Sequence, residues 1–216
     1  MYKTTLRARF IKTGRAVYIS HLDVMRTIAR AFRRTNIPFW YTEGFTPRIY
    51  LDFQLPLTLG VAGMNEFFDF AIVGEADPKK YKKMLNDVLP FGIKIIEIAP
   101  PVHDRMEIAL AAYEIRLSGI TAEELNRFLS RETIEAKKFS KKSGMKIIDL
   151  KPMISYPKIT ETADGVILTL TLPAGNKHNI NSSVLTETIK NEFNQKAEII
   201  YEKRIKLLLE NGEEFS

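Results

Sequence analysis

The sequence predicts an α+β fold made of two tandem ferredoxin-like (split βαβ) domains, each an antiparallel sheet backed by two helices. Length is the first observation behind this prediction, because 216 residues exceed the usual size of one domain. The second is the order of the periodic segments in the first half, which is strand, helix, strand, strand, helix, strand. The third is that the same order recurs in the second half. We therefore expect domains over residues 1–103 and 104–216.

The elements of the first half follow from alternation, helical spacing and capping residues. Leu6, Ala8 and Phe10 alternate with basic residues, which is typical of a strand. Ser20 is a typical helix N-cap, with Asp23 in the place of the usual capping-box glutamate. The expected order is a strand over 4–11, a helix over 21–35, strands over 49–55 and 68–72 joined by a loop over 56–65, a helix over 78–89 and a strand over 93–98.

The second half gives the same order with less regular patterns. Thr121 and Glu124 form a capping-box signature, and Asn181 or Ser182 caps a later helix. Five lysines between residues 137 and 146 predict a solvated loop there. The expected order is a strand over 113–117, a helix over 121–137, an extended segment over 146–156, a strand over 166–172, a helix over 182–193 and a strand over 197–209.

Positive charge is concentrated at the beginning of the chain. The net charge is +6, and residues 1–48 contain 10 basic and 2 acidic side chains. A local field of this size attracts polyanions, of which RNA and anionic phosphate ligands are the main candidates. A solubilising basic face without a ligand is the alternative.

Several classes of protein are excluded by composition. The chain has no cysteine, so it forms no disulfide, uses no thiol nucleophile and holds no thiolate-bound zinc or iron–sulfur cluster. No apolar run reaches the roughly 20 residues that span a bilayer, and we expect a cytoplasmic protein without membrane contact. No metal-ligand spacing is present, and we expect no cofactor.

Three short motifs lie in or after the helix expected over residues 21–35, which contains Arg26, Arg30, Arg33 and Arg34. They are Ser20-His21-Leu22-Asp23, the turn Gly44-Phe45-Thr46-Pro47-Arg48 and the loop Pro56-Leu57-Thr58-Leu59-Gly60. Together with the arginine-rich helix they resemble the radical-SAM-linked protein family, whose turn has Ser and Asn where this chain has Thr42 and Thr46. That resemblance implies an accessory role beside a cobalamin-binding radical-SAM enzyme, with no known substrate. By architecture alone the chain is also similar to the duplicated ferredoxin-like RNA-processing endonucleases of CRISPR systems, which implies RNA binding or cleavage.

Arginines on the first helix are the main candidates for ligand binding. Arg26, Arg30, Arg33 and Arg34 share one stripe, because their spacing is i, i+4, i+7 and i+8. Guanidinium groups bind phosphate oxygens in bidentate fashion. A solvated helix face is the alternative for this stripe.

Two other segments extend the predicted site. Gly14 turns the chain so that Lys12 and Arg15 lie near the N-terminal end of the helix, where backbone N–H groups attract anions. Gly44 and Pro47 make a rigid turn that presents Phe45 and Arg48. The complete predicted RNA- or phosphate-binding set is Lys12, Arg15, Arg26, Arg30, Arg33, Arg34, Gly44, Phe45 and Arg48.

The sheet face opposite the helices has two interpretations. Arg7, Arg9, Tyr50 and Phe67 would point to this face and resemble an RNA-binding platform. We prefer the interpretation in which the two arginines pair across strands with Asp52 or Asp69.

His21 is the best candidate for proton transfer, with Tyr18 just before it. A histidine at a helix start is also a common structural hydrogen-bonding group. We therefore expect a non-catalytic RNA- or phosphate-ligand-binding accessory protein that is associated with a radical-SAM enzyme. The alternatives are a metal-independent ribonuclease that uses His21, and an interaction module with no nucleic-acid ligand.

Overall fold

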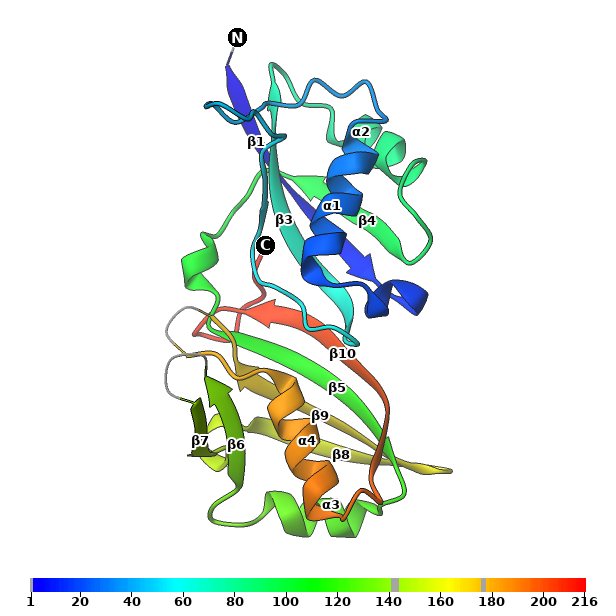
Figure 1. The fold of residues 1–216 in the computed structure, drawn as a ribbon, viewed down its shortest axis with the longest axis vertical. Coiled ribbons are helices and arrows are strands. Elements are labelled where there is room, and N and C mark those ends of the chain that lie inside the picture. Colours follow the sequence, from blue (N-terminus) through cyan, green and yellow to red (C-terminus); the bar gives the residue numbers. More distant parts are fainter. Residues whose placement is uncertain (1, 141–143, 176–177) are drawn as a thin grey trace. The chain divides into compact units, whose positions relative to one another are not determined.

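The computed structural model describes residues 2–140, 144–175 and 178–216, and has a mixed α/β fold (Figure 1). Its strand pairs are antiparallel within each half, and the described residues contain four α-helices. None of these helices is long and apolar enough to cross a membrane. The chain divides into two units, one that runs to Glu107 and includes Glu214–Ser216, and a second that covers Ile108–Glu213.

The N-terminal unit has a sheet of order β4-β1-β3-β2 with two helices. The strand pairs of this sheet are antiparallel. Its elements in chain order are β1 (Lys3–Lys12), α1 (His21–Phe32), β2 (Leu51–Phe53), β3 (Ala62–Val73), α2 (Pro78–Asn86) and β4 (Ile93–Ala99), with short 3-10 helices η1 (Gly14–Tyr18) and η2 (Arg105–Glu107). The predicted succession of strands and helices in the first half is therefore confirmed, although β3 starts earlier and β2 is shorter than expected.

A capping residue starts each helix of this unit, and the cap predicted at Ser20 is present. Ser20 Oγ accepts a hydrogen bond from the backbone N–H of Asp23 at 3.2 Å, and Asp77 accepts one from Lys80 at 3.0 Å. Pro78 occupies the first turn of α2, where its missing N–H costs no hydrogen bond. Helix α1 ends at Phe32 rather than near residue 35.

Aromatic residues form much of the core between α1 and the sheet. Phe32 stacks on Phe39 with 4.4 Å between ring centroids and also meets Phe68 and Phe70. All four side chains are buried. Because each buried phenylalanine contributes about 1.5–3 kcal/mol, this cluster fixes α1 firmly on the sheet.

Arg7 is buried on the other face of the sheet. Its Nε and Nη2 donate to the two carboxylate oxygens of Asp69 at 2.7 and 2.9 Å, which confirms the predicted cross-strand pair. Its Nη1 donates to the backbone oxygens of His103 and Ser216 at 2.7 and 2.8 Å. The ring of Phe215 lies 4.6 Å from its guanidinium carbon. One side chain thus joins β1, β3, the segment after β4 and the last residues of the chain.

The predicted partner of Arg9 is wrong. Arg9 pairs with Glu97 at 2.8 Å, because that carboxylate lies directly opposite it on β4. Asp52 pairs instead with Arg105 at 3.2 Å. Since Arg7 is engaged and Phe67 is buried, this part of the sheet does not form an open platform for bases.

The C-terminal unit has a sheet of order β10-β5-β9-β8 and a separate pair, β6-β7. The predicted capping box of Thr121 and Glu124 is present, and Asn181 is the N-cap of the last helix. The elements are β5 (Leu110–Ser118), α3 (Ala122–Leu129), β6 (Glu135–Ser140), β7 (Gly144–Asp149), η3 (Lys151–Met153), β8 (Ser155–Thr162), β9 (Gly165–Pro173), α4 (Ser182–Glu192) and β10 (Glu198–Leu208).

Two predictions in this unit are wrong. The helix expected over 121–137 ends at Leu129, where the ammonium of Lys151 caps the carbonyl oxygen of Leu129 at 2.6 Å. In the loop expected over 137–146, residues 137–140 belong to β6 and residues 144–146 to β7, and these two strands pair with each other. Ile134, just before β6, donates its N–H to Asp149 at the end of β7 at 2.8 Å. Residues 141–143 of that expected loop lie outside the described residues.

Glu202 is a buried carboxyl group on β10, close to Ser182 at the start of α4. Burial raises the pKa of Glu202, and Ser182 lowers it by a smaller amount. Within the described residues, neither Glu202 Oε1 nor Ser182 Oγ has a partner in good hydrogen-bonding geometry. The charged form of Glu202 is therefore a local cost to the folded state.

Arg7→Met should lower the free energy of unfolding by about 3–5 kcal/mol, because it leaves the buried Asp69 carboxylate unpaired. Arg9→Met is the matched control, since its ion pair is exposed and should contribute at most about 1 kcal/mol. Chemical denaturation of the two variants gives both values. Equal losses for the two variants would contradict the role assigned to Arg7.

Glu202→Gln should stabilise the protein increasingly as the pH rises. The folded state binds the Glu202 proton more tightly than the unfolded chain does, because the pKa of an ordinary glutamate is 4.5 and burial raises it in the folded state. The cost of ionising Glu202 is therefore absent below that value, grows as the pH rises toward the folded-state pKa and is constant above it. Denaturation at pH 4 and pH 8 measures the change, with the exposed Glu198→Gln as a control that should show no such trend. A stability difference independent of pH would refute this assignment.

Candidate functional site

The exposed face of α1 carries the predicted arginine stripe. Val24, Ile28 and Phe32 are buried on one side of this helix. Arg26 and Arg30 are exposed on the opposite side, and Arg33 and Arg34 are exposed in the turn that follows Phe32. The structure therefore brings all four guanidinium groups to the solvent side of one amphipathic helix.

Few carboxylates balance this charge. Asp23 accepts a hydrogen bond from Ser20 at 2.7 Å and pairs with Arg26 at 3.4 Å. The Ser20 hydrogen bond lowers the pKa of Asp23, with a further contribution from Arg26. Both members of the Asp23–Arg26 pair are largely exposed, so it holds Arg26 only weakly. In the part of the chain that the structure describes, no ion pair involves Arg30, Arg33 or Arg34.

The predicted turn is the tip of a hairpin at the edge of the sheet. Tyr41 bridges Ile49, and the hairpin is closed because Thr42 N–H donates to the Arg48 oxygen at 2.7 Å and Arg48 N–H donates to Thr42 Oγ1 at 3.1 Å. Gly44 has φ +116°, a conformation that favours glycine. Phe45 is fully exposed, with a relative accessibility of 111%. The turn thus presents Phe45 and Arg48 to solvent.

The aromatic residues before the turn have internal roles. Phe39 belongs to the core. The rings of Trp40 and Tyr50 meet edge to face, and the ammonium of Lys3 lies 4.3 Å from both ring centroids. Burial raises the pKa of Tyr50, with smaller contributions from Asp52 and Asp69. These two rings hold a cation of the chain itself.

Lys12 lies inside the N-terminal unit rather than on its surface. Only 1% of it is exposed, and its neighbour on β3 is Gly63. Glu66, which is also buried, folds over Gly63: a Cβ there would lie 2.4 Å from Glu66 Cγ. Gly63 therefore makes room for a carboxylate on the strand next to Lys12. Arg15, in contrast, is exposed in η1.

His21 faces the core rather than the solvent. It is the first residue of α1, is partly buried, and meets the edge of Phe53 with 5.1 Å between ring centroids. Phe53 in turn packs against Phe10 and Phe68. Tyr18, the suggested partner of His21 in proton transfer, is largely exposed. This placement favours a structural role for His21.

The predicted site residues are spread along the N-terminal unit from one end to the other. Gly63, opposite Lys12, and Ile72, opposite Phe39, are nine residues apart on β3. At about 3.3 Å per residue they are separated by about 30 Å. Lys12, Arg15 and His21 lie at the first end; Arg33, Arg34, Gly44, Phe45 and Arg48 lie toward the second; Arg26 and Arg30 lie between them along α1.

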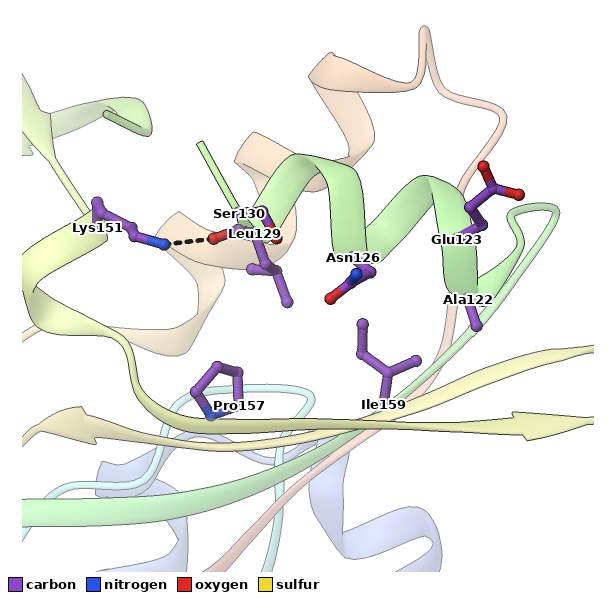
Figure 2. Close-up of a pocket in the computed structure, with 8 residues that line it drawn as sticks. All are labelled: Ala122, Glu123, Asn126, Leu129, Ser130, Lys151, Pro157 and Ile159. Atoms are coloured by element: carbon purple, nitrogen blue, oxygen red, sulfur yellow. Dashed lines mark hydrogen bonds between the residues drawn. The ribbon is translucent and has the colours of Figure 1, made fainter. Parts of the chain in front are cut away.

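A pocket in the C-terminal unit was not predicted. It lies between α3 and β8, and its volume is about 530 Å³ (Figure 2). Asn126 points into it from α3, toward Pro157 and Ile159 of β8, and the Lys151–Leu129 hydrogen bond lies at one end. The lining residues come from separate segments of no shared motif, so the sequence pattern contained no signal for it. No residue of the predicted site lines this pocket.

The described residues contain no cluster of three or more His, Cys, Asp or Glu side chains that could hold a metal ion. By its fold and this surface, the chain is a mixed α/β protein with a row of exposed arginines on and just after one helix. The chain belongs to a bacterial family: the model of DUF2344, described as an uncharacterized protein conserved in bacteria, matches residues 5–182. This match includes α1, the turn and the 56–60 loop. No curated protein matches the chain.

His21→Ala should lower the free energy of unfolding by about 1–2 kcal/mol, because it removes a partly buried ring from its contact with Phe53. Leu22→Ala is the control on the same turn, where the side chain is exposed and the change should stay within about 0.5 kcal/mol. Chemical denaturation measures both. A stability loss no greater for His21→Ala than for Leu22→Ala would leave His21 without a structural role.

Proposed function

We propose that this protein is a non-catalytic accessory protein that binds RNA, or another ligand with several phosphates, through the exposed arginines of α1. The observation that carries the proposal is the row of four guanidinium groups with one weakly paired carboxylate beside it. Arginine faces without a ligand usually carry interspersed acidic residues. Guanidinium groups also match the geometry of phosphate oxygens.

The length of this surface favours a polymer over a single phosphate group. Helix α1 has 12 residues and is therefore about 18 Å long. Arg15 precedes the helix and Arg48 lies on the hairpin beyond it, and both are exposed. A chain of phosphates can contact these cations in sequence, whereas one phosphate group can contact only two or three of them.

The proposed partner is a radical-SAM enzyme, and the proposed compartment is the cytoplasm, where RNA is available. The partner proposal is supported by the motif resemblance at Ser20–Asp23, Gly44–Arg48 and Pro56–Gly60. It is compatible with the lack of cysteine, since the enzyme itself would hold the iron–sulfur cluster. A conserved position of such an enzyme's gene beside the gene of this protein would support it.

We further propose that the two units are tandem ferredoxin-like domains. The support is that the sheet orders β4-β1-β3-β2 and β10-β5-β9-β8 correspond strand by strand when β6 and β7 are treated as an insertion. In both orders the first and last strands of the unit are neighbours, as in the split βαβ arrangement.

Replacing Arg26, Arg30 and Arg33 together by Ala should weaken binding to a labelled RNA about 100-fold at 0.1 M salt. Each lost phosphate contact on a single strand removes about 0.7 from the slope of log K against log salt, so the slope should flatten by roughly 2. Fluorescence anisotropy at several salt concentrations measures both quantities.

The matched control removes the same charge from the other unit. Lys137, Lys146 and Lys158 are exposed there, and their triple Ala variant should keep most of the affinity. Equal weakening by both triple variants would mean that net charge, and not the α1 surface, attracts RNA. Absence of RNA binding by the wild-type protein at low salt would refute the proposal.

Catalysis by His21 is tested with the same RNAs in EDTA between pH 5 and pH 9. We expect no specific cleavage, because His21 faces Phe53 and the core. Cleavage that disappears in His21→Ala, with folding and RNA affinity retained, would make the protein a metal-independent ribonuclease instead.

A further inference from the structure

Exposed aromatic rings lie on segments near the first turn of α1 and on the hairpin that follows this helix. Tyr18 and Phe91 have relative accessibilities of 75% and 92%. Tyr41 and Phe45 have values of 46% and 111%. Single exposed aromatic rings are common on protein surfaces. Rings beside a basic surface, however, offer faces on which nucleic-acid bases can stack.

Phe91 and Tyr18 belong to the end of the N-terminal unit where α1 begins. The loop between α2 and β4 is tied to η1, because Thr13 N–H donates to the Gly92 oxygen at 2.7 Å. Phe91 lies against Gly14, whose Cβ would be 3.5 Å from Phe91 Cε1. Tyr18 is the last residue of η1. Figure 1 shows η1, in dark blue, and the loop before β4 near the first turn of α1.

Tyr41 and Phe45 belong to the hairpin near the other end of α1. This hairpin follows Phe39, which stacks on Phe32 in the last turn of the helix. The Thr42–Arg48 hydrogen bonds hold its tip. One aromatic pair, Tyr18 and Phe91, therefore lies near the first turn of α1, and the other, Tyr41 and Phe45, lies on the hairpin after α1. Arg26 and Arg30 are on the helix that joins these two segments.

We propose that the RNA bound by this surface is single-stranded, with bases stacked on Phe91 or Tyr18 at one end and on Phe45 or Tyr41 at the other. This inference rests on the proposed function. Phosphates between the two stacked positions would contact Arg26 and Arg30. Aromatic rings combined with a basic surface are the usual means of binding single strands, because every base offers a face for stacking. In an A-form duplex those faces are covered by neighbouring base pairs.

A protein partner fits the same rings less well. A protein-docking surface needs a contiguous apolar centre with charges at its rim. Here the order is reversed, because exposed arginines occupy the middle of the surface and the rings lie at its two ends. Phosphates and bases alternate along a single strand, which matches this arrangement.

The test compares a labelled unstructured RNA of about 12 nucleotides with the same RNA in a duplex, by fluorescence anisotropy. This RNA length lies within the range of site sizes known for proteins that bind single strands, about 4–16 nucleotides. Phe45→Ala and Phe91→Ala should each weaken single-strand binding about 5- to 100-fold, the equivalent of one lost stacking contact. The salt slope should stay unchanged, because neither variant removes a charge. Binding of an RNA of about four nucleotides should be weakened less by these two variants, since such a short strand cannot reach both aromatic pairs.

Tyr156→Asn is the matched control. Tyr156 is an equally exposed ring in the C-terminal unit, and asparagine tolerates its φ of +51°. This variant should bind as the wild type does. Thermal unfolding of each variant excludes loss of folding as the cause of weaker binding.

The outcomes separate this inference from the proposed function. Tighter binding of the duplex, or full single-strand affinity in the Phe45→Ala and Phe91→Ala variants, overturns single-strand recognition while the arginine surface remains a polyanion site. Single-strand recognition is also overturned if the Phe45→Ala and Phe91→Ala variants bind the RNA normally but bind a protein partner more weakly than the wild type does. Failure of the wild-type protein to bind either RNA at low salt refutes the proposed function itself.

Discussion

The buried guanidinium of Arg7 constrains much of the N-terminal unit. It binds both oxygens of Asp69 and two backbone oxygens, and the ring of Phe215 covers one side of it. A buried cation is costly unless its donors are satisfied, and here strands, the segment near His103 and the end of the chain must all adopt their positions to satisfy them. One consequence concerns the proposed function: Arg7 and Phe67 are buried on this sheet face, so the proposed binding surface lies on the helix side of the unit.

Arginines of the same sequence region therefore have different roles, and burial decides which. Arg7 and Arg9 are on β1, where carboxylates of the neighbouring strands lie opposite them. Arg26 and Arg30 are on the exposed side of α1. The first two stabilise the sheet and the other two keep their charge available to solvent. A net positive charge over residues 1–48 does not by itself distinguish these roles.

Helix α1 connects the core to the proposed binding surface. Phe32 fixes one end of it through its contacts with Phe39, Phe68 and Phe70, and His21 fixes the other against Phe53. Both loops that present exposed rings are held by backbone hydrogen bonds to ordered segments. Such a surface is preorganised, so little conformational entropy is lost when a ligand binds.

The succession of elements in the first half, the caps at Ser20 and Thr121 and the arginine stripe on α1 follow from local patterns in the sequence, because periodicity and capping are local properties. The tertiary structure, in contrast, was needed to show that Lys12 is buried next to Gly63, that His21 contacts Phe53 and that Arg9 pairs with Glu97. It also turned lysine-rich residues expected as a loop into β6 and β7, and brought Phe91 beside Gly14. Each of these depends on a partner distant in the chain, and a distant partner leaves no periodic pattern in the sequence around a residue.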